Sequence, residues 1–208
     1  IMTNKIKGNL FIISAASGAG KTSLVKDILL RNEDIILSIS HTTRKPRPGE
    51  INGKDYFFVK ENTFNQMKKE GRFLESARCH GELYGTSLDF VKQAQDIRKD
   101  IIFEVDWQGA DSIKKFFKNA ISIFILPPSL EKLEERLKAR GQDSEDTIKA
   151  RLSEAKSEMS HIEKFDYVTI NDKFNDALED IKVIIMAENL KTKNQMIHHN
   201  QLIEKLTK

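Results

Sequence analysis

The residues with the clearest chemical meaning lie in the segment Ser14-Ala15-Ala16-Ser17-Gly18-Ala19-Gly20-Lys21-Thr22, directly after the apolar run Leu10-Phe11-Ile12-Ile13. Gly18 and Gly20 allow the backbone to curl so that successive N–H groups face an anion, with the positive end of a helix behind them. Lys21 is placed to reach the β- and γ-phosphates of a nucleoside triphosphate, and the Thr22 hydroxyl to ligate Mg²⁺. The segment therefore predicts a phosphate-binding loop, which we call the phosphate loop (residues 15–22).

This loop departs from the usual pattern G-x-x-x-x-G-K-[S/T] at its first position, where Ala15 replaces glycine. Alanine keeps a small side chain there, so we expect the loop to form nonetheless. The strand-like run before it and the apolar stripe after it, Leu24-Val25 with Ile28-Leu29, supply the strand–loop–helix context that the motif requires. A loop that merely contains glycines is the alternative.

A second charged segment, His41-Thr42-Thr43-Arg44-Lys45-Pro46-Arg47-Pro48-Gly49-Glu50, places three cations within four positions. The two prolines restrict the chain, and arginines held in fixed positions bind a phosphate with paired hydrogen bonds. The segment therefore indicates a phosphate-gripping turn. An exposed basic turn is the alternative that these residues alone leave open.

Apolar, β-rich runs recur along the chain, and a segment of helical character follows each one. The runs are Leu10–Ser14, Ile101–Asp106, Ser122–Leu126 and Tyr167–Ile170, and the helical segments are Lys21–Arg31, Gln108–Phe117, Ser129–Arg140 and Asn175–Leu190. Such alternation is typical of a parallel sheet covered on both faces. We therefore expect an α/β fold with a parallel sheet flanked by helices, of the type found in phosphate-loop nucleoside triphosphatases.

Two regions differ from this alternating pattern. Between about residues 35 and 84, short strand-like pieces are joined by turn signals, which predicts a small, largely antiparallel insertion. Residues 129–164 are strongly helical and highly charged, with a break at Gly141-Gln142-Asp143-Ser144 and a helix start at Ser144. The predicted division is a core of residues 7–34, 88–128 and 165–208, an insertion of residues 35–87, and a helical region of residues 129–164.

Composition narrows the class of partner. A formal net charge of +3 over 208 residues suits an anionic ligand, but no basic block interleaved with aromatic residues points to nucleic acid. The single cysteine excludes an internal disulfide and fits a reducing compartment. Because no apolar stretch approaches the roughly 18 residues that span a bilayer, we expect no membrane partner and a cytoplasmic location.

Taken together, these segments closely resemble the guanylate kinases, from about residue 7 to beyond residue 190. Five further motifs carry the resemblance: Asn52-Gly53-Lys54-Asp55-Tyr56, Phe73-Leu74-Glu75, Tyr84-Gly85-Thr86, Val105-Asp106-Trp107-Gln108-Gly109-Ala110 and Tyr167-Val168-Thr169-Ile170-Asn171-Asp172. One such match could be accidental, but their order and spacing together make coincidence very improbable.

The resemblance implies a GMP site in the insertion. The GMP phosphate would be gripped by Arg44, Arg47, Tyr56 and Tyr84. The guanine base would be read by Glu75, because adjacent N1–H and N2–H₂ donors suit one carboxylate and adenine has no N1–H. The resemblance also places the hydroxyls of Ser40 and Thr86 near the guanine O6.

Glu104 and Asp106 end the strand-like run Ile101–Asp106. Residues two apart on a strand share a face, so both side chains are expected in the crevice where α/β sheets bind ligands. The resemblance implies that Glu104 helps to hold GMP and that Asp106 approaches the metal through water. An acidic strand end that caps a nearby helix is the alternative.

Arg136 and Arg140 are four residues apart on a predicted helix and are therefore neighbours on its surface. With Arg151 in a second helical segment, surface arginines are the simpler interpretation of the residues alone. The resemblance implies instead that all three belong to a mobile lid that closes on the transferring phosphoryl group. It also places Asn171 near the adenine of ATP.

The activity implied by the resemblance is transfer of the γ-phosphoryl group of MgATP to GMP or dGMP, in purine nucleotide metabolism. The implied catalytic residues are Lys21, Arg44, Arg136, Arg140 and Arg151, and the residues implied to hold ATP are Ala15, Ala16, Ser17, Gly18, Ala19, Gly20, Lys21, Thr22 and Asn171. Two alternatives remain: a guanylate-kinase-like module that binds phosphopeptides without catalysis, and a phosphate-loop kinase with another small acceptor. The intact Gly20-Lys21-Thr22 argues against the module, and a homo-oligomer stays open.

Overall fold

The computed structural model describes residues 8–79, 81–96, 99–139 and 144–207. Its main sheet has the strand order β2-β7-β1-β8-β9, and each neighbouring pair is parallel. The strands are β2 (Ile35–Ser38), β7 (Asp100–Glu104), β1 (Leu10–Ala15), β8 (Ile121–Leu126) and β9 (Tyr167–Ile170). The predicted α/β fold with a parallel sheet is therefore confirmed.

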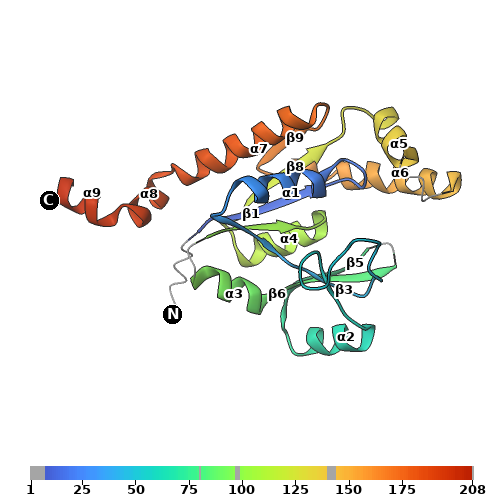
Figure 1. Cartoon of the computed structure of the whole chain (residues 1–208), viewed down its shortest axis with the longest axis horizontal. Coiled ribbons are helices and arrows are strands. Elements are labelled where there is room, and N and C mark those ends of the chain that lie inside the picture. Colours follow the sequence, from blue (N-terminus) through green and yellow to red (C-terminus); the bar gives the residue numbers. More distant parts are fainter. Residues whose placement is uncertain (1–7, 80, 97–98, 140–143, 208) are drawn as a thin grey trace.

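Helices cover both faces of this sheet (Figure 1). Successive residues of a strand point to opposite faces, so the central strand β1 feeds two cores. Phe11 and Ile13 pack with α1 (Lys21–Arg31) and α7 (Phe174–Asn189), whereas Leu10 and Ile12 pack with α3 (Leu88–Asp96) and α4 (Trp107–Phe116). All of β1 is buried, which explains its continuous apolar sequence and makes it a rigid base for the phosphate loop.

A second, mixed sheet has the strand order β4-β3-β6-β5, in which β3 and β4 are parallel and the other pairs antiparallel. Its strands are β3 (His41–Thr42), β4 (Phe57–Phe58), β5 (Phe73–Cys79) and β6 (Glu82–Ser87), with α2 (Glu61–Lys69) alongside. From here on the name insertion means residues 41–87, the part of the predicted range 35–87 that carries this second sheet. β2 lies within the range 35–87 but pairs with β7 in the main sheet, because Ile35 and Ile36 supply apolar side chains to its two faces.

The charged helical region forms α5 (Leu130–Ala139), α6 (Glu145–Met159) and the short 3₁₀ helix η1 (Ile162–Lys164). The Ser144 hydroxyl caps α6 by accepting a hydrogen bond from the Thr147 N–H, as expected for a helix start. Figure 1 shows that α5, α6 and the insertion lie at the same end of the molecule, around the carboxyl ends of the main strands.

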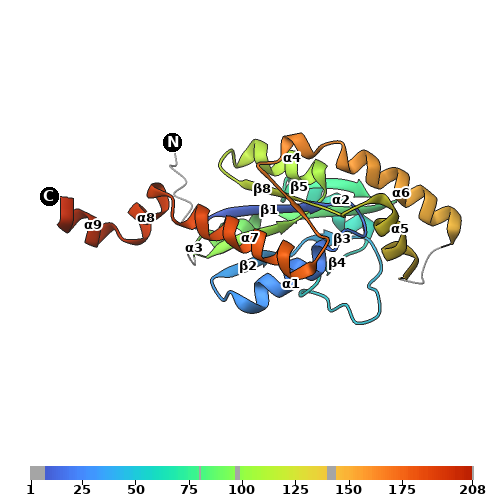
Figure 2. The ribbon, with the colours of Figure 1, turned by 90° about the horizontal axis from the view of Figure 1, so that it is seen from above.

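The C-terminal helices α8 (Thr192–His198) and α9 (Asn200–Thr207) extend from the opposite end (Figure 2). The Asn194 amide anchors α8, donating hydrogen bonds to the Asn9 side chain at 3.0 Å and to the Glu188 carbonyl at 2.6 Å. No residue of α9 is buried. Within the described part of the chain, no helix combines the length and apolar character needed to cross a membrane.

Candidate active site

The phosphate loop joins β1 to α1 in the conformation that an anion site needs. Gly18 and Gly20 have φ values of 92° and 100°, in the left-handed region that favours glycine. A side chain at Gly20 would also place a Cβ 2.4 Å from the Asn171 amide nitrogen, so it would displace the Asn171 side chain. Ala15 ends β1 as a buried residue, and the loop forms without glycine at that position.

Lys21 and Thr22 begin α1 and point toward the carboxyl end of the neighbouring strand β7. The Lys21 ammonium donates a hydrogen bond to the Val105 carbonyl at 3.0 Å, and the Thr22 hydroxyl donates to the Glu104 carboxylate at 2.5 Å. The structure therefore brings the loop's cation and hydroxyl together with one of the two predicted acids. These oxygens lie in the crevice where parallel α/β sheets bind ligands.

Asp106 lies at the amino end of α4, where its carboxylate accepts a hydrogen bond from the Gly109 N–H at 2.8 Å. This is the helix-capping arrangement that the sequence left as an alternative. Its charge also reaches across to Glu75 in the insertion, whose pKa it affects. Capping and an approach to a water-bound metal are compatible, so the metal role of Asp106 stays a prediction.

The basic turn is organised by Glu50, which sequence reasoning did not select. One Glu50 oxygen accepts from the Arg44 guanidinium at 2.8 Å, and the other accepts from the Arg47 N–H at 2.7 Å. Burial opposes ionisation of Glu50, but these two hydrogen bonds outweigh it and lower the pKa of the carboxyl. The available signal was the acid three residues after Arg47, at the end of the basic turn.

Aromatic side chains complete the surface around Arg44. Its guanidinium lies over the rings of Tyr56 and Phe58, 5.4 and 5.8 Å from their centroids. Tyr56 and Tyr84 meet edge to face at a centroid distance of 6.0 Å. Burial raises the pKa of Tyr56 far above its usual value and the charge of Glu104 raises it further, so the phenol remains a hydrogen-bond donor. Three of the residues predicted to grip a phosphate, Arg44, Tyr56 and Tyr84, therefore lie together, and the charge of Glu104 reaches Tyr56. The fourth, Arg47, is exposed and joins this group through its main-chain N–H to Glu50.

Glu75 is a buried acid on β5. It is 8% exposed and accepts a hydrogen bond at 2.6 Å from the hydroxyl of Thr86, a fully buried residue of β6. A register shift between Phe73 and Glu75 reorients this part of the strand. Burial raises the pKa of the Glu75 carboxyl to about 7, an effect that Thr86 opposes and Asp106 strengthens. Ser40, the third residue predicted near a base, is also buried.

The helical region reaches the phosphate loop through Asn171. The Asn171 amide donates to the Ala19 carbonyl at 2.7 Å, and the Asn171 carbonyl accepts from the Arg136 guanidinium at 2.8 Å. The other terminal nitrogen of Arg136 is buried and has no partner among the residues that the structure describes. Arg151 lies on α6, half-buried, and Arg140 lies outside the described residues. The structure thus places Asn171 behind the loop, whereas its predicted contact with adenine stays a prediction.

The segment after α6, which includes η1, also contacts the first residue of α4. The Trp107 and His161 rings stack with centroids 3.6 Å apart, and the Lys164 ammonium lies 5.0 Å from the Trp107 centroid. Trp107 follows Asp106, so this contact joins the helical region to the strand end that carries the predicted metal-directed acid.

The Thr22 hydroxyl and the Glu104 carboxylate, both oxygen groups suited to Mg²⁺, meet at the mouth of the loop. No group of three or more His, Cys, Asp or Glu side chains arranged to hold a metal occurs within residues 8–79, 81–96, 99–139 and 144–207. Mg²⁺ does not need one, since it usually keeps several waters and binds one or two protein oxygens together with substrate phosphates. Thr22, Glu104 and Asp106 fit that requirement.

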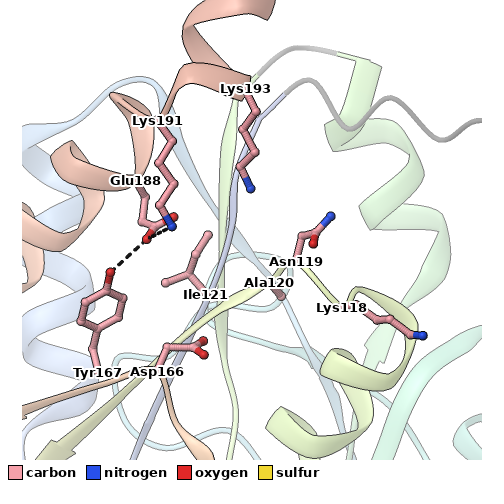
Figure 3. Close-up of a pocket in the computed structure, with 9 residues that line it drawn as sticks. All are labelled: Lys118, Asn119, Ala120, Ile121, Asp166, Tyr167, Glu188, Lys191 and Lys193. Atoms are coloured by element: carbon pink, nitrogen blue, oxygen red, sulfur yellow. Dashed lines mark hydrogen bonds and ion pairs between the residues drawn. The ribbon is translucent and has the colours of Figure 1, made fainter.

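A separate cavity of about 410 Å³ lies at the opposite edge of the main sheet, by the amino ends of β8 and β9 (Figure 3). One oxygen of the Glu188 carboxylate accepts from the Tyr167 hydroxyl at 3.0 Å and pairs with Lys191 at 2.6 Å. The cavity contains none of the predicted site residues. The candidate active site is therefore the crevice at the carboxyl ends of the strands.

A strand, phosphate loop and helix that face a basic, carboxylate-bearing insertion define a nucleotide-binding protein of the phosphate-loop class. The family model described as guanylate kinase matches residues 7–188. The chain belongs to the guanylate kinase family, and the resemblance seen in the sequence is confirmed.

Individual relatives cover nearly the whole chain. A guanylate kinase of Methylobacillus flagellatus is 53% identical over 97% of this chain and 100% of its own length. One of Nitrosospira multiformis is 49% identical over 97% of this chain and 96% of its own length. Among solved structures, guanylate kinase from Anaplasma phagocytophilum matches with a TM-score of 0.75 and 32% identity, covering 89% of this chain and 88% of that one.

Proposed function

We propose that this protein transfers the γ-phosphoryl group of MgATP to GMP, and to dGMP as a second acceptor, giving ADP and the nucleoside diphosphate. The observation that carries the proposal is the buried Glu75 carboxylate beside Thr86, in the same insertion as the Arg44 turn. A carboxylate accepts the N1–H and N2–H₂ donors of guanine together, and an unpaired buried oxygen is costly when the base lacks them.

GMP would bind to the carboxylate form of Glu75. Burial raises the pKa of this carboxyl to about 7, so near neutral pH the ligand-free protein carries it partly protonated, and a ligand with two hydrogen-bond donors would favour ionisation. Guanine supplies two such donors, which favour the ionised form. Adenine, cytosine and uracil do not present the same adjacent pair, so they leave the carboxylate short of partners.

The reaction needs positioning and charge stabilisation more than covalent chemistry. The loop amides and Lys21 would hold the β- and γ-phosphates, and Arg44 and Arg47 would orient the acceptor phosphate. Arg136, Arg140 and Arg151 would close on the moving group. Because the acceptor phosphate is already an anion near neutral pH, no general base is required.

Mg²⁺ would enter with ATP as a substrate-bound ion. Thr22 would supply a direct ligand and Asp106 a hydrogen bond to a coordinated water, and the metal would neutralise charge on the β- and γ-phosphates. We propose the insertion as the GMP subdomain, residues 129–164 as the lid, and the reducing cytoplasm as the place of the reaction.

The non-catalytic phosphopeptide module is the weaker alternative. The phosphate loop keeps its left-handed glycines, its lysine and its threonine. A module that binds peptides without catalysis requires none of these features. The relatives over nearly the full chain are named guanylate kinases.

An ADP-release assay across GMP, dGMP, AMP, CMP and UMP tests the proposal. We expect ADP release that depends on GMP or dGMP and exceeds that with the other nucleotides by at least about a hundredfold. Equal rates with AMP would support a kinase with another acceptor. ADP release that no nucleotide stimulates, combined with phosphopeptide binding, would support the module.

A further inference from the structure

The helices of the proposed lid pack directly on the first half of the phosphate loop. Ala16 is 3% exposed and shares an apolar cluster with Leu133 and Leu137 of α5 and Ala155 of α6. A Cβ built on Gly18 would lie 3.0 Å from the Leu133 and Leu137 side chains. The loop and the helices of the proposed lid are therefore in van der Waals contact.

Glu158 adds a polar contact at the same place. It lies in the last turn of α6, and its carboxylate accepts a hydrogen bond from the Ser17 N–H at 3.2 Å. Ser17 stands between Ala16 and Gly18, the two loop residues that the lid already contacts. An acidic side chain is thus bonded to the main chain of a loop whose other N–H groups are expected to face phosphate.

Glu158 shares a helix face with the proposed phosphoryl-directed arginine. Arg151 precedes it by seven residues, which is close to two helical turns and about 10.5 Å along the axis. One end of this face is therefore fixed to the phosphate loop through Ser17, and the other end carries Arg151. A rigid helix between them sets the distance from the loop to the arginine.

We propose that Glu158 is a positioning residue for ATP: its hydrogen bond to Ser17 fixes the first half of the phosphate loop to α6, so that the loop and the lid arginine approach the triphosphate as one unit. This inference rests on the proposed function, because it assigns Glu158 a part in that reaction. Glu158 does not touch the reacting atoms. It acts through Ser17 and through the helix.

The hydrogen bond of Glu158 and its negative charge would have opposite effects on ATP binding. A negative charge beside the loop repels phosphate, so a role through charge alone would make ATP binding tighter when the charge is removed. A role through the hydrogen bond makes ATP binding weaker when the acceptor oxygen is removed. Glu158→Gln removes the charge and keeps an acceptor oxygen, whereas Glu158→Ala removes both.

The experiment measures KM for ATP, KM for GMP and kcat, together with the Kd of a non-hydrolysable ATP analogue, for the wild type and both variants. We expect Glu158→Ala to raise KM and Kd for the ATP ligand about tenfold and to lower kcat, with KM for GMP within twofold of the wild type. Glu158→Gln should restore values close to the wild type. Glu163→Ala, which removes an exposed glutamate close by in η1, is the matched control and should change nothing.

Three results would overturn the inference: an ATP Kd within twofold of the wild type in Glu158→Ala, an equal defect in Glu158→Gln, or a parallel loss of GMP affinity with a lower melting temperature. If Glu158→Ala does not fold, two other variants test the inference. Glu158→Asp withdraws the acceptor oxygen by one carbon and should raise the Kd for the ATP analogue. Glu158→Gln should keep values close to the wild type. Because the Kd needs no turnover, it tests Glu158 even if the wild type does not phosphorylate GMP.

Discussion

Glu50 and Arg44 form a hydrogen-bonded ion pair at 2.8 Å, with side chains only 19% and 16% exposed. The same carboxylate accepts from the Arg47 main chain, so one acid fixes both the turn and the guanidinium within it. Arginine otherwise carries about 2 kcal/mol of side-chain entropy, which a bound phosphate would have to overcome. Glu50 therefore prepares Arg44 for its ligand.

Glu50→Ala should raise KM for GMP about tenfold and leave KM for ATP unchanged, because Arg44 loses its support while the phosphate loop is untouched. Steady-state kinetics with each substrate varied would measure both values. Glu61→Gln, which breaks the exposed pair with Arg78 at 3.2 Å, is a suitable control and should have no effect. A lower KM for GMP would mean instead that Glu50 competes with the phosphate.

Glu75→Gln should make the ligand-free protein more stable at alkaline pH and lower its turnover of GMP. Between pH 4.5 and about 7 the folded protein holds a proton on Glu75 that the unfolded chain releases, so stability from this group falls as pH rises through that window. Removing the buried charge should therefore stabilise the ligand-free protein by about 1–3 kcal/mol at pH 8 and have little effect at pH 4. Urea denaturation at the two pH values measures this.

The same variant should lose GMP turnover by at least about a hundredfold while its Kd for an ATP analogue stays within twofold, because the amide cannot accept both guanine donors. Unchanged turnover would remove Glu75 from the base site. If the variant and the wild type were equally stable at pH 8, burial of the ionised Glu75 would not destabilise the folded protein.

Asp106→Asn distinguishes the two roles of Asp106. Asparagine caps helices about as well as aspartate, so the melting temperature should change little. If the carboxylate holds a metal-bound water, the Mg²⁺ concentration for half-maximal activity should rise several-fold, since the amide carries no charge. An unaltered Mg²⁺ requirement would leave Asp106 as a helix cap alone.

Asn194→Ala should weaken the attachment of α8. The amide makes two hydrogen bonds, to the Asn9 side chain and the Glu188 carbonyl, and their loss should lower the free energy of unfolding by about 1–2 kcal/mol. Removal of α9 by truncation after His199 should cost much less, because none of its residues is buried. Chemical denaturation of the two variants would measure both losses of stability. A larger loss for the truncation after His199 than for Asn194→Ala would contradict this prediction.

Local features of the chain could be predicted where the backbone conformation or the burial of a position allows only a few residue types. The phosphate loop is such a case, because Gly18 and Gly20 occupy left-handed positions that few other residues adopt. The buried strands are another, since a strand with cores on both faces must be apolar throughout. The start of α6 at Ser144 followed from capping chemistry.

Contacts between distant segments were not predictable in the same way. Glu158 and Ser17 are 141 residues apart and Asn171 and Ala19 are 152 apart, so only the fold brings them together. β2 was expected in the insertion because its neighbours in sequence belong there, yet tertiary pairing with β7 places it in the main sheet. Arg140 lies outside the described residues, so its place in the site stays a prediction.

Trp107 is the sole tryptophan of the chain, and it stacks on His161 just beyond the end of α6. Its emission consequently comes from one point, at the base of the part that is proposed to move. Because Trp107 lies where the proposed lid meets α4, its fluorescence can follow ligand-induced motion of the lid in the unlabelled, unmodified protein.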